Sequence, residues 1–352
     1  MIEKEVFKDF DLPLECEVIA LNTGLINNSF VVKDGLNKAF LIQKINHQIF
    51  SKPIDIQKNY LSISNHLKEK NSFHLPEIIL TNDNKLITKI QDDYWRCMEF
   101  IQHSFSPLIA NNSAEAFTVA QCFGKYSADL LDIDISKIKI ILPGFHDLNL
   151  RFQQFRSSLQ TATESRKSIV KEEIRLAFVY ESYVDLFNYI VTENKQFPLH
   201  ILHQDCKIAN ILFSDIDNSI ICPIDLDTTQ PGLFFSDLGD MIRSMVPNIS
   251  ENEIHIENME IREDFLLAIK DGYLDAMGKA LTKAELAFLD KSGPIIIYMQ
   301  ALRFLTDFLN GDIYYRTNYE MQNRDRAKNQ FHLLQLLNKV VESKVSNPLF
   351  SV

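Results

Sequence analysis

The sequence predicts an α+β fold of two lobes, with a small antiparallel-sheet lobe followed by a larger, mainly helical lobe. First, 352 residues exceed what one compact core usually holds. Second, short β-type runs separated by polar turns fill residues 15–98, whereas long helical stretches follow from about 105. Third, one β-rich island at residues 210–226 interrupts the helical part. We therefore expect an N-terminal lobe at 1–98, a hinge at 99–104 and a C-terminal lobe at 105–352.

The first lobe is built from strands and one helix. The runs CEVIALN, NSFVV and KAFLIQKI alternate with polar turns. After Pro53 the apolar positions Ile56, Tyr60, Ile63 and Leu67 recur at helical spacing, so this segment is a predicted amphipathic helix. EIILT and KLITKI flank the turn NDN, and YWRCMEFI follows. The pattern predicts a five-stranded sheet with one inserted helix.

The second lobe is predicted to consist mainly of helices. The helical pattern covers residues 113–132, 147–160, 168–194, 258–278, 282–311 and 323–343. The island between them contains the runs NILFS and IICPIDL, separated by the turn DIDN. This island is a predicted hairpin within a helical lobe.

Composition and charge exclude several classes of protein. Apolar residues make up 46% and charged residues 24%, which is typical of globular proteins. The net charge of −11 disfavours a nucleic-acid or anionic-membrane surface, which requires clustered Lys and Arg. The sequence shows neither a signal peptide nor a long apolar span, so we expect a cytoplasmic protein. Five widely spread cysteines without a C-x-x-C pair indicate neither disulfides nor a zinc site.

The segment HQDCKIANILF contains a cluster of polar side chains directly before an apolar run. Its pattern H-x-D-x-x-x-x-N places His203, Asp205 and Asn210 at the catalytic-loop spacing of phosphoryl-transfer enzymes. Asp205 is the candidate base, which accepts or orients the proton of a substrate hydroxyl. His203 either takes part in the chemistry or holds the shape of the loop. Lys207 either steadies the transferring phosphoryl group or is solvated.

Metal ligands are expected in the segment PIDLDTTQPG. Asp225 and Asp227 follow an apolar run twenty residues after Asp205, and Asn210 adds an amide oxygen. Carboxylate and amide oxygens are the ligands that Mg²⁺ uses to hold nucleotide phosphates. An acid-rich turn is the alternative interpretation of an isolated D-x-D pattern. Together with the upstream loop, the pattern favours metal binding.

Nucleotide-binding groups are expected in the first lobe. Lys44 shares a strand face with Phe40 and Ile42, from which it reaches toward phosphates or, alternatively, into water. The loop LNTGLINNSF is expected to cover the phosphates, with Gly24 as its only glycine and Asn27 and Asn28 as amide donors or as residues in unusual backbone conformations. In the hinge, the backbone from Met98 to Ile101, including Glu99, is expected to pair with adenine.

Substrate-binding groups are expected near the segment ALRFLTDFLNGDIYYRT. Arg303 and Tyr314 combine hydrogen-bond donors with an aromatic ring, as a pocket for a sugar or other polyol requires. The alternative is one more core helix with a polar turn. In PGFHDL, His146 and Asp147 either line the same pocket or cap the following helix.

On these motifs the chain resembles the aminoglycoside phosphotransferase and choline kinase superfamily, which has the protein-kinase-like fold. The segments GLINNSF, FLIQKIN, LHQDCKIANILF, CPIDLDTTQPG and ALRFLTDFLNGDIYY are most similar to the N-acetylhexosamine 1-kinase branch. The resemblance spans residues 20–335. It implies Asp205 as the catalytic aspartate, Asn210 and Asp225 as magnesium ligands, Lys44 beside ATP, and Arg303 and Tyr314 on the sugar.

The chain departs from the family pattern at one ion pair. The helix glutamate that usually pairs with the strand lysine has no match, since the helix has acids only at its ends, Asp55 and Glu69. The expected activity is phosphorylation of the anomeric hydroxyl of a hexose or N-acetylhexosamine with ATP and Mg²⁺. The alternatives are an aminoglycoside, choline or amino alcohol as acceptor, or a nucleotide-binding protein without catalytic activity.

Overall fold

The computed structural model describes residues 2–21, 26–35 and 38–345. The chain forms two compact units. Unit 1 comprises Met1–Ser106, Asp129–Pro143 and Asn210–Pro231, and unit 2 comprises the remaining segments Pro107–Ala128, Gly144–Ala209 and Gly232–Val352. The β-rich island thus belongs to the same unit as the N-terminal sheet. We still only predict that the N-terminal lobe binds the nucleotide, that the C-terminal lobe binds the substrate and that a hinge joins them.

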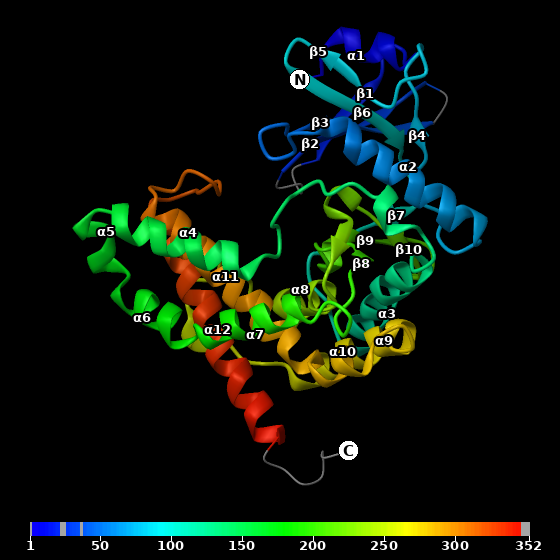
Figure 1. The fold of residues 1–352 in the computed structure, drawn as a ribbon. Coiled ribbons are helices and arrows are strands. Elements are labelled where there is room, and N and C mark those ends of the chain that lie inside the picture. Colours follow the sequence, from blue (N-terminus) through cyan, green and yellow to red (C-terminus); the bar gives the residue numbers. More distant parts are fainter. Residues whose placement is uncertain (1, 22–25, 36–37, 346–352) are drawn as a thin grey trace. The chain divides into compact units, whose positions relative to one another are not determined.

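The sheet of unit 1 is antiparallel throughout (Figure 1). Its order is β1-β2-β3-β6-β4, and β5 also pairs with β6. The bounds are β1 Glu17–Leu21, β2 Asn28–Lys33, β3 Ala39–Ile45, β4 Ile78–Ile79, β5 Thr88–Ile90 and β6 Asp93–Glu99. The five-stranded prediction was wrong by one strand, because the short strands β4 and β5 both pair with β6.

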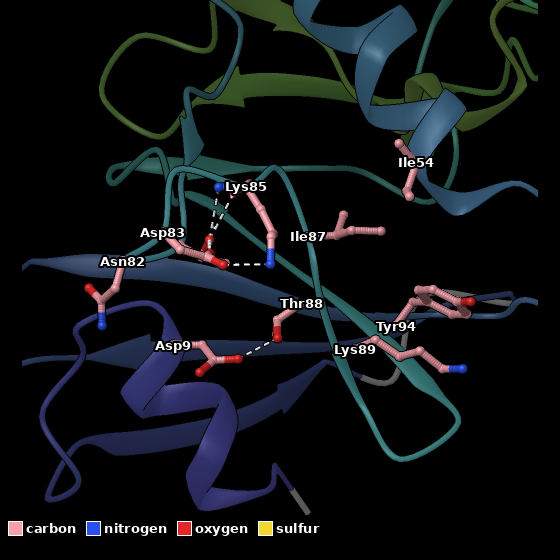
Figure 2. A pocket seen from close by; sticks show the side chains of 10 residues that line it. Asp9, Ile54, Asn82, Asp83, Lys85, Ile87, Thr88, Lys89 and Tyr94 are labelled. Carbon is pink, nitrogen blue, oxygen red and sulfur yellow. Dashed lines mark hydrogen bonds and ion pairs between the residues drawn. The ribbon is translucent and has the colours of Figure 1, made fainter.

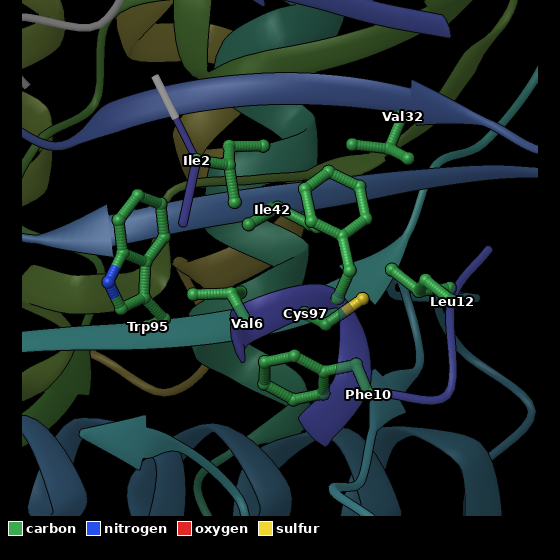
Figure 3. Close-up of a cluster of buried hydrophobic side chains, with 9 residues drawn as sticks. Ile2, Val6, Phe10, Leu12, Val32, Ile42, Trp95 and Cys97 are labelled. Atoms are coloured by element: carbon green, nitrogen blue, oxygen red, sulfur yellow. The ribbon is translucent and has the colours of Figure 1, made fainter. Parts of the chain in front are cut away.

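The two faces of this sheet carry different side chains. One face holds Val32, Ile42, Trp95 and Cys97, which pack against the helix α1, Lys4–Asp9 (Figure 3). On the other face Ile45 packs with Ile56 of α2, Pro53–Glu69. The predicted helix after Pro53 is confirmed, with the proline in its first turn. Helix α1 was not predicted, because its charged residues conceal the apolar face formed by Val6, Phe7 and Phe10.

The predicted hairpin in the β-rich island is confirmed. β9, Ile211–Ser214, pairs with β10, Ile220–Pro223, and also with the short strand β7, Ser104–Phe105. The turn Leu226–Thr228 begins directly after Asp225 and contains Asp227.

Unit 2 is mainly helical, with α11 packed against α12, α8 and α4 (Figure 1). Its helices are α3 Ser113–Asp129, α4 Leu148–Thr161, α5 Glu164–Ile169, α6 Lys171–Val179, α7 Ser182–Thr192, α8 Phe235–Met245, α9 Glu263–Met277, α10 Lys283–Ala287, α11 Ser292–Leu309 and α12 Gln322–Val345. The short strands β8, His200–Leu202, and β11, Gln230–Gly232, flank the two polar loops. No helix in the described part of the chain is both long enough and apolar enough to span a membrane.

Helix α8 was not predicted, and two of the predicted helices each correspond to two helices in the structure. The predicted helices 168–194 and 282–311 are each divided by a turn, into α6 and α7 and into α10 and α11. Helix α8 contains Gly239 and buried charged residues, which obscure its helical pattern. A Cβ at Gly239 would lie 2.4 Å from the carbonyl oxygen of Ser292. The glycine therefore allows α8 to pack directly against the start of α11.

Candidate active site

The predicted catalytic loop, residues 203–207, follows β8 in unit 2 and is held by a buried carboxylate. Asp237, in the first turn of α8, is fully buried. Its Oδ1 accepts the backbone N–H of Gln204 at 2.7 Å, and its Oδ2 accepts that of His203 at 3.2 Å. Ser127 donates its hydroxyl to the same Oδ2 at 3.1 Å. These bonds stabilise Gln204 in the left-handed region, at φ 66°, which is unfavourable for most residues other than glycine.

His203 has the surroundings of a structural residue. Its ring is fully buried and lies edge-on to Phe123 and Tyr126, with centroids 5.1 and 5.9 Å away. Its Nδ1 accepts the backbone N–H of Asp205 at 3.3 Å. This geometry favours the interpretation that His203 holds the shape of the loop.

Asp205 and Lys207 lie together at the end of this loop. The Lys207 ammonium donates to Oδ2 of Asp205 at 3.0 Å, and both side chains are partly exposed. An ionised carboxylate is able to accept a proton from a hydroxyl. Cys206, between them, is fully buried, and burial raises the pKa of its thiol well above the usual value. The Cys206 thiol is therefore not a nucleophile.

The metal loop of unit 1 has Asp225 at its exposed position. Asp225 adopts a left-handed backbone conformation, φ 61° and ψ 51°, directly after β10. The preceding residue, Ile224, donates its N–H to the backbone carbonyl of Asn210 at 2.9 Å. This bond joins the two segments that carry the predicted metal ligands. In the described part of the chain no three His, Cys, Asp or Glu residues cluster as a metal site.

These donors fit magnesium better than a metal held only by protein. Mg²⁺ usually binds one or two protein oxygens and takes its other ligands from water and phosphate. Asp225 supplies an exposed carboxylate, and Asn210, which is 4% exposed, supplies an amide on the adjoining segment. The magnesium roles of Asn210 and Asp225 are not tested by this geometry and stay predictions.

Asp227 has surroundings opposite to those of Asp225. It is 2% exposed, and its two oxygens accept the Nη1 and Nη2 groups of Arg96 at 2.6 and 3.0 Å. The Asn27 amide donates to Oδ2 of Asp227 at 2.8 Å. Both oxygens are therefore engaged by protein groups. This geometry favours a structural role for Asp227 over the predicted metal role.

The predicted nucleotide residues have mixed surroundings. Lys44 pairs with Asp93 of β6 at 2.5 Å, not with a residue of α2, and Asn28 lies opposite Lys44 on β2. Asn27 Oδ1 accepts the N–H of Asn46 at 3.0 Å, so both ends of its amide are bonded. Gly24 lies outside the described residues. Nucleotide contacts of these residues stay predictions.

The predicted hinge is partly engaged in the sheet. Glu99 donates its backbone N–H to Glu77 at 2.8 Å, and the Ile101 carbonyl accepts the Ser104 hydroxyl at 2.5 Å. That the backbone from Met98 to Ile101 pairs with adenine stays a prediction.

A cluster of arginine and aromatic side chains forms in unit 2 around Arg303 of α11. The guanidinium carbon lies 5.4 Å from the ring centroid of Phe145, 5.9 Å from that of Tyr314 and 5.5 Å from that of Tyr315. Arg303 also donates to Gln300 at 3.4 Å. The structure therefore brings together Arg303, Tyr314 and the segment that contains His146. Their contacts to a substrate stay predictions.

This cluster is cationic. Burial, together with the charges of Arg303 and Arg151, lowers the pKa of His146 from 6.5 to about 3, so the imidazole is neutral at neutral pH. Burial and Arg303 likewise lower the pKa of Arg151 to about 10. The Nδ1 atom of His146 has no hydrogen-bond partner among the described residues. Asp147 instead caps α4 by accepting the N–H of Leu150 at 3.0 Å, which favours the capping alternative.

Helix α8 supplies a second buried carboxylate, Asp240. It is 4% exposed, and its Oδ1 accepts Nε of Arg243 at 2.9 Å, while Arg243 also binds Glu251 at 2.7 Å. Burial raises the pKa of Asp240, and the charge of Asp205 adds to this effect. Among the described residues Oδ2 of Asp240 has no hydrogen-bond partner.

A cavity of about 550 Å³ in unit 1 is lined by other residues (Figure 2). Asp83 pairs with Lys85 at 2.5 Å, Asp9 with Thr88, and Lys89 lies 5.4 Å from the ring centre of Tyr94. Of the described residues predicted to act on substrate or nucleotide, none lines this cavity. This cavity is therefore not the place where the candidate site residues gather.

Sequence reasoning missed Arg96, Asp237 and Asp240. A signal for Arg96 was present, because it is the only basic residue in the apolar run YWRCMEF. Asp237 and Asp240 lie three residues apart in FSDLGDMIRS, the spacing that places two residues on one face of a helix. Their partners are remote in sequence, so the pattern gave no indication of what these charges bind.

Comparison with solved structures supports the kinase-like fold. An aminoglycoside phosphotransferase from Alicyclobacillus acidocaldarius aligns with a TM-score of 0.63 at 12% identity, over 97% of both chains. A microcompartment-associated aminopropanol kinase aligns with a TM-score of 0.62 at 15% identity, over 96% of both chains. A Plasmodium vivax ethanolamine kinase aligns with a TM-score of 0.56 at 15% identity, over 92% of this chain and 84% of that chain. These likenesses confirm the predicted bilobal α+β fold.

The family follows from the sequence match. Residues 17–281 match the phosphotransferase enzyme family, APH, and this range includes both polar loops and the sheet of unit 1. The predicted superfamily is thereby confirmed, whereas the sugar-kinase branch is not tested by this match. The chain belongs to the phosphotransferase enzyme family.

Proposed function

We propose that this protein is an ATP- and Mg²⁺-dependent small-molecule kinase that phosphorylates the anomeric hydroxyl of an N-acetylhexosamine. The observation that carries the kinase part is the pair of loops in a member of the phosphotransferase family. One loop presents Asp205 on a rigid backbone held by Asp237, and the other presents Asp225 as an exposed carboxylate. When bound, Mg²⁺ neutralises and orients the nucleotide phosphates.

In this proposal Asp205 accepts a hydrogen bond from the substrate hydroxyl and takes its proton as the phosphoryl group is transferred. Lys207, 3.0 Å from Asp205, adds positive charge where phosphate charge accumulates. Asp225 and Asn210 would hold the metal. Asp205 and Lys207 follow β8, Asn210 directly precedes β9, and Asp225 follows β10.

The chemistry of the cluster around Arg303 supports a neutral polyol as acceptor. Arg303, Arg151 and Arg243 are cations, and His146 is neutral because its pKa is about 3. A protonated amine gains little among these cations, whereas sugar hydroxyls and an acetamido group find both donors and acceptors. Oδ2 of Asp240 and Nδ1 of His146 are buried acceptors without a hydrogen-bond partner among the described residues. Phe145 and Tyr314 offer faces for the sugar ring.

An amino alcohol or aminoglycoside is the second candidate acceptor. It is favoured by what the similar structures act on, which are described as aminopropanol kinase, ethanolamine kinase and aminoglycoside phosphotransferase. The buried carboxylate of Asp240 would be the group that binds an ammonium in that case. Against it, Asp240 is already paired with Arg243.

The test is the chemical structure of the product. The purified protein with ATP, Mg²⁺ and N-acetylglucosamine or N-acetylgalactosamine should give a sugar 1-phosphate, whose phosphorus NMR signal is split by the anomeric proton. Methyl glycosides of the same sugars should be inert, because their anomeric oxygen has no proton to transfer. A 6-phosphate product, phosphorylation of methyl glycosides, or a preference for an amino alcohol over every free hexose would contradict the sugar assignment.

A matched pair of variants tests the role of the cluster. Arg303→Lys should raise the KM for the sugar by about tenfold or more, because a planar, stacked guanidinium is not replaced by an ammonium. Arg316→Lys, on an exposed arginine of the neighbouring loop, is the control and should leave the KM unchanged. The KM for ATP should be unchanged in both variants. Equal effects on the sugar and ATP would argue against a substrate role for Arg303.

A further inference from the structure

The metal loop is connected to the sheet of unit 1 by a side chain of β6, not by the strand lysine. In the antiparallel pair β3 and β6, Lys44 lies opposite Trp95, and Gln43 lies opposite Arg96. Opposed residues share a face of the sheet, and successive residues alternate between faces. Lys44 is therefore on the face of Trp95 and Cys97, which α1 covers (Figure 3). Arg96 is on the opposite face, from which it reaches the metal loop.

All three nitrogens of the Arg96 guanidinium donate hydrogen bonds to protein groups. Its side chain is 3% exposed, and it donates to both oxygens of Asp227 at 2.6 and 3.0 Å. Its Nε donates to Gln43 at 2.9 Å, and Gln43 in turn donates to Ser29 at 2.8 Å. Burial alone would lower the pKa of Arg96, but the carboxylate of Asp227 raises it, so the guanidinium keeps its charge. A bidentate pair of this kind fixes both distance and orientation.

The two aspartates of the metal loop consequently have separate functions. Both oxygens of Asp227 already accept hydrogen bonds from Arg96 and Asn27, so a cation bound there would compete with a buried guanidinium for the same carboxylate. Breaking one side of a buried ion pair is strongly unfavourable. Asp225, two residues earlier, is exposed and adopts a left-handed backbone conformation, which costs energy unless its surroundings enforce it.

We infer that Arg96 is the positioning residue of the metal loop: through Asp227 it holds the backbone that presents the Asp225 carboxylate. In protein kinases the pair of a strand lysine and a helix glutamate orders the site. Helix α2 has no glutamate before Glu69 at its end, and Lys44 pairs with Asp93. In this protein the ion pair of Arg96 and Asp227 instead connects the sheet to the metal loop. The inference rests on the proposed function where it concerns magnesium, and on the fold alone where it concerns the loop.

The first test measures the loop without any ligand. Amide hydrogen exchange of residues 225–229, read by mass spectrometry, should be at least tenfold faster in Arg96→Lys than in wild type, because an ammonium cannot make the bidentate contact. The control is Lys33→Met, which removes an exposed cation of the same sheet, paired with Glu17 at 3.9 Å. It should exchange as wild type does. Wild-type exchange in Arg96→Lys would overturn the inference whether or not the protein is a kinase.

The second test separates positioning from a general structural role. Calorimetric titration with ADP should show at least a tenfold higher Mg²⁺ requirement in Arg96→Lys, with metal-free ADP affinity within twofold of wild type. The double variant Arg96→Met, Asp227→Asn should be no worse in Mg²⁺ requirement than Arg96→Met alone, because the two residues act as a unit. Equal losses with and without metal, or additive losses in the double variant, would overturn it. A wild type without Mg²⁺-dependent ADP binding would contradict the proposed function, and the exchange result would still decide on the loop.

Discussion

The catalytic loop of unit 2 and the metal loop of unit 1 each hold a residue in a left-handed backbone conformation, but they do so with different contacts. Each loop contains a non-glycine residue in the left-handed region, Gln204 at φ 66° and Asp225 at φ 61°. Each is held by a buried aspartate. Asp237 accepts two backbone N–H groups of its loop, whereas Asp227, within its loop, accepts side-chain groups of Arg96 and Asn27. The catalytic loop is held through its backbone N–H groups by a side chain of α8. The metal loop is held through the Asp227 side chain by Arg96 and Asn27.

This difference determines which substitutions would disturb the conformation of each loop. Backbone N–H groups are present whatever the residue, so the bonds from the catalytic loop to Asp237 do not require particular side chains at positions 203 and 204. The metal loop is held by two side chains, Arg96 of β6 and Asn27, the residue before β2. In each loop the more exposed aspartate, Asp205 or Asp225, is the one proposed to act in the reaction, and a buried aspartate contacts the groups that hold the loop. The predictions below test this division, beginning with the largest effect.

Asp205→Asn should reduce turnover by about 10² to 10⁴ while ADP binding stays within a few-fold of wild type. The change removes the hydroxyl-orienting carboxylate and leaves the sheet of unit 1 untouched. Single-turnover kinetics and calorimetry on the same sample measure both quantities. Turnover within a few-fold of wild type would contradict the assignment of Asp205 as the working aspartate of its loop.

Asp237→Asn should lower the free energy of unfolding by about 3 kcal/mol or more, since hydrogen bonds from two backbone N–H groups and one hydroxyl to a charged acceptor are weakened together. Asp264→Asn, an exposed aspartate in the first turn of α9, is the control and should change stability by less than about 0.5 kcal/mol. Denaturant unfolding gives both values. Equal stability of the two variants would mean that Asp237 does not hold the catalytic loop.

Asn27→Ala should destabilise the protein by about 2 kcal/mol, because it removes one charge-assisted bond to Asp227 and the bond to the N–H of Asn46. Asn28→Ala, whose side chain is exposed at the neighbouring position, should have a smaller effect. Thermal unfolding of the two variants sharpens the comparison. If Asn28→Ala proved the more damaging, the side-chain support of the metal loop would have to be reassigned.

His146→Gln should alter the pH dependence of stability. The folded-state pKa of His146 is about 3, whereas an unfolded histidine titrates near about 6.5. Between these values the unfolded state binds the extra proton, so acidification destabilises the wild type, by at most about 1.4 kcal/mol per pH unit from this group. The variant should therefore lose stability less steeply between about pH 6 and about pH 4. Parallel curves for the two proteins would show that His146 is not shielded from protonation beside Arg303.

The sequence predicted the parts of the site that lie within one short segment. His203, Asp205 and Asn210 share one segment, and Asp225 follows an apolar strand, so their spacing indicated both loops. The sheet, α2 and the hairpin β9 and β10 were predicted for the same reason. Arg96 and Asp227 are 131 residues apart, and His203 and Asp237 are 34 apart. Such partners are set by tertiary packing, and a single sequence contains no periodic signal for them.

Helix α8 shows the same limit at the level of secondary structure. Its sequence FSDLGDMIRSM contains a glycine, two serines and two aspartates, all poor helix formers. The helix forms because nearly all of it is buried and because Gly239 permits close packing on α11. Tertiary contacts thus override propensity at the element that carries Asp237 and Asp240, both of which sequence reasoning missed.

The most direct test of the division between exposed and buried aspartates is a Mg²⁺ titration of ADP binding in Asp225→Asn and Asp227→Asn, with the thermal stability of each measured in parallel. We expect Asp225→Asn to lose the gain in ADP affinity that Mg²⁺ provides while it melts within a few degrees of wild type. Asp227→Asn should melt at a clearly lower temperature and, below that temperature, keep part of the Mg²⁺-dependent gain. The reverse order of severity, with Asp227→Asn abolishing the effect of Mg²⁺ and Asp225→Asn preserving it, would contradict the account and transfer the metal to Asp227.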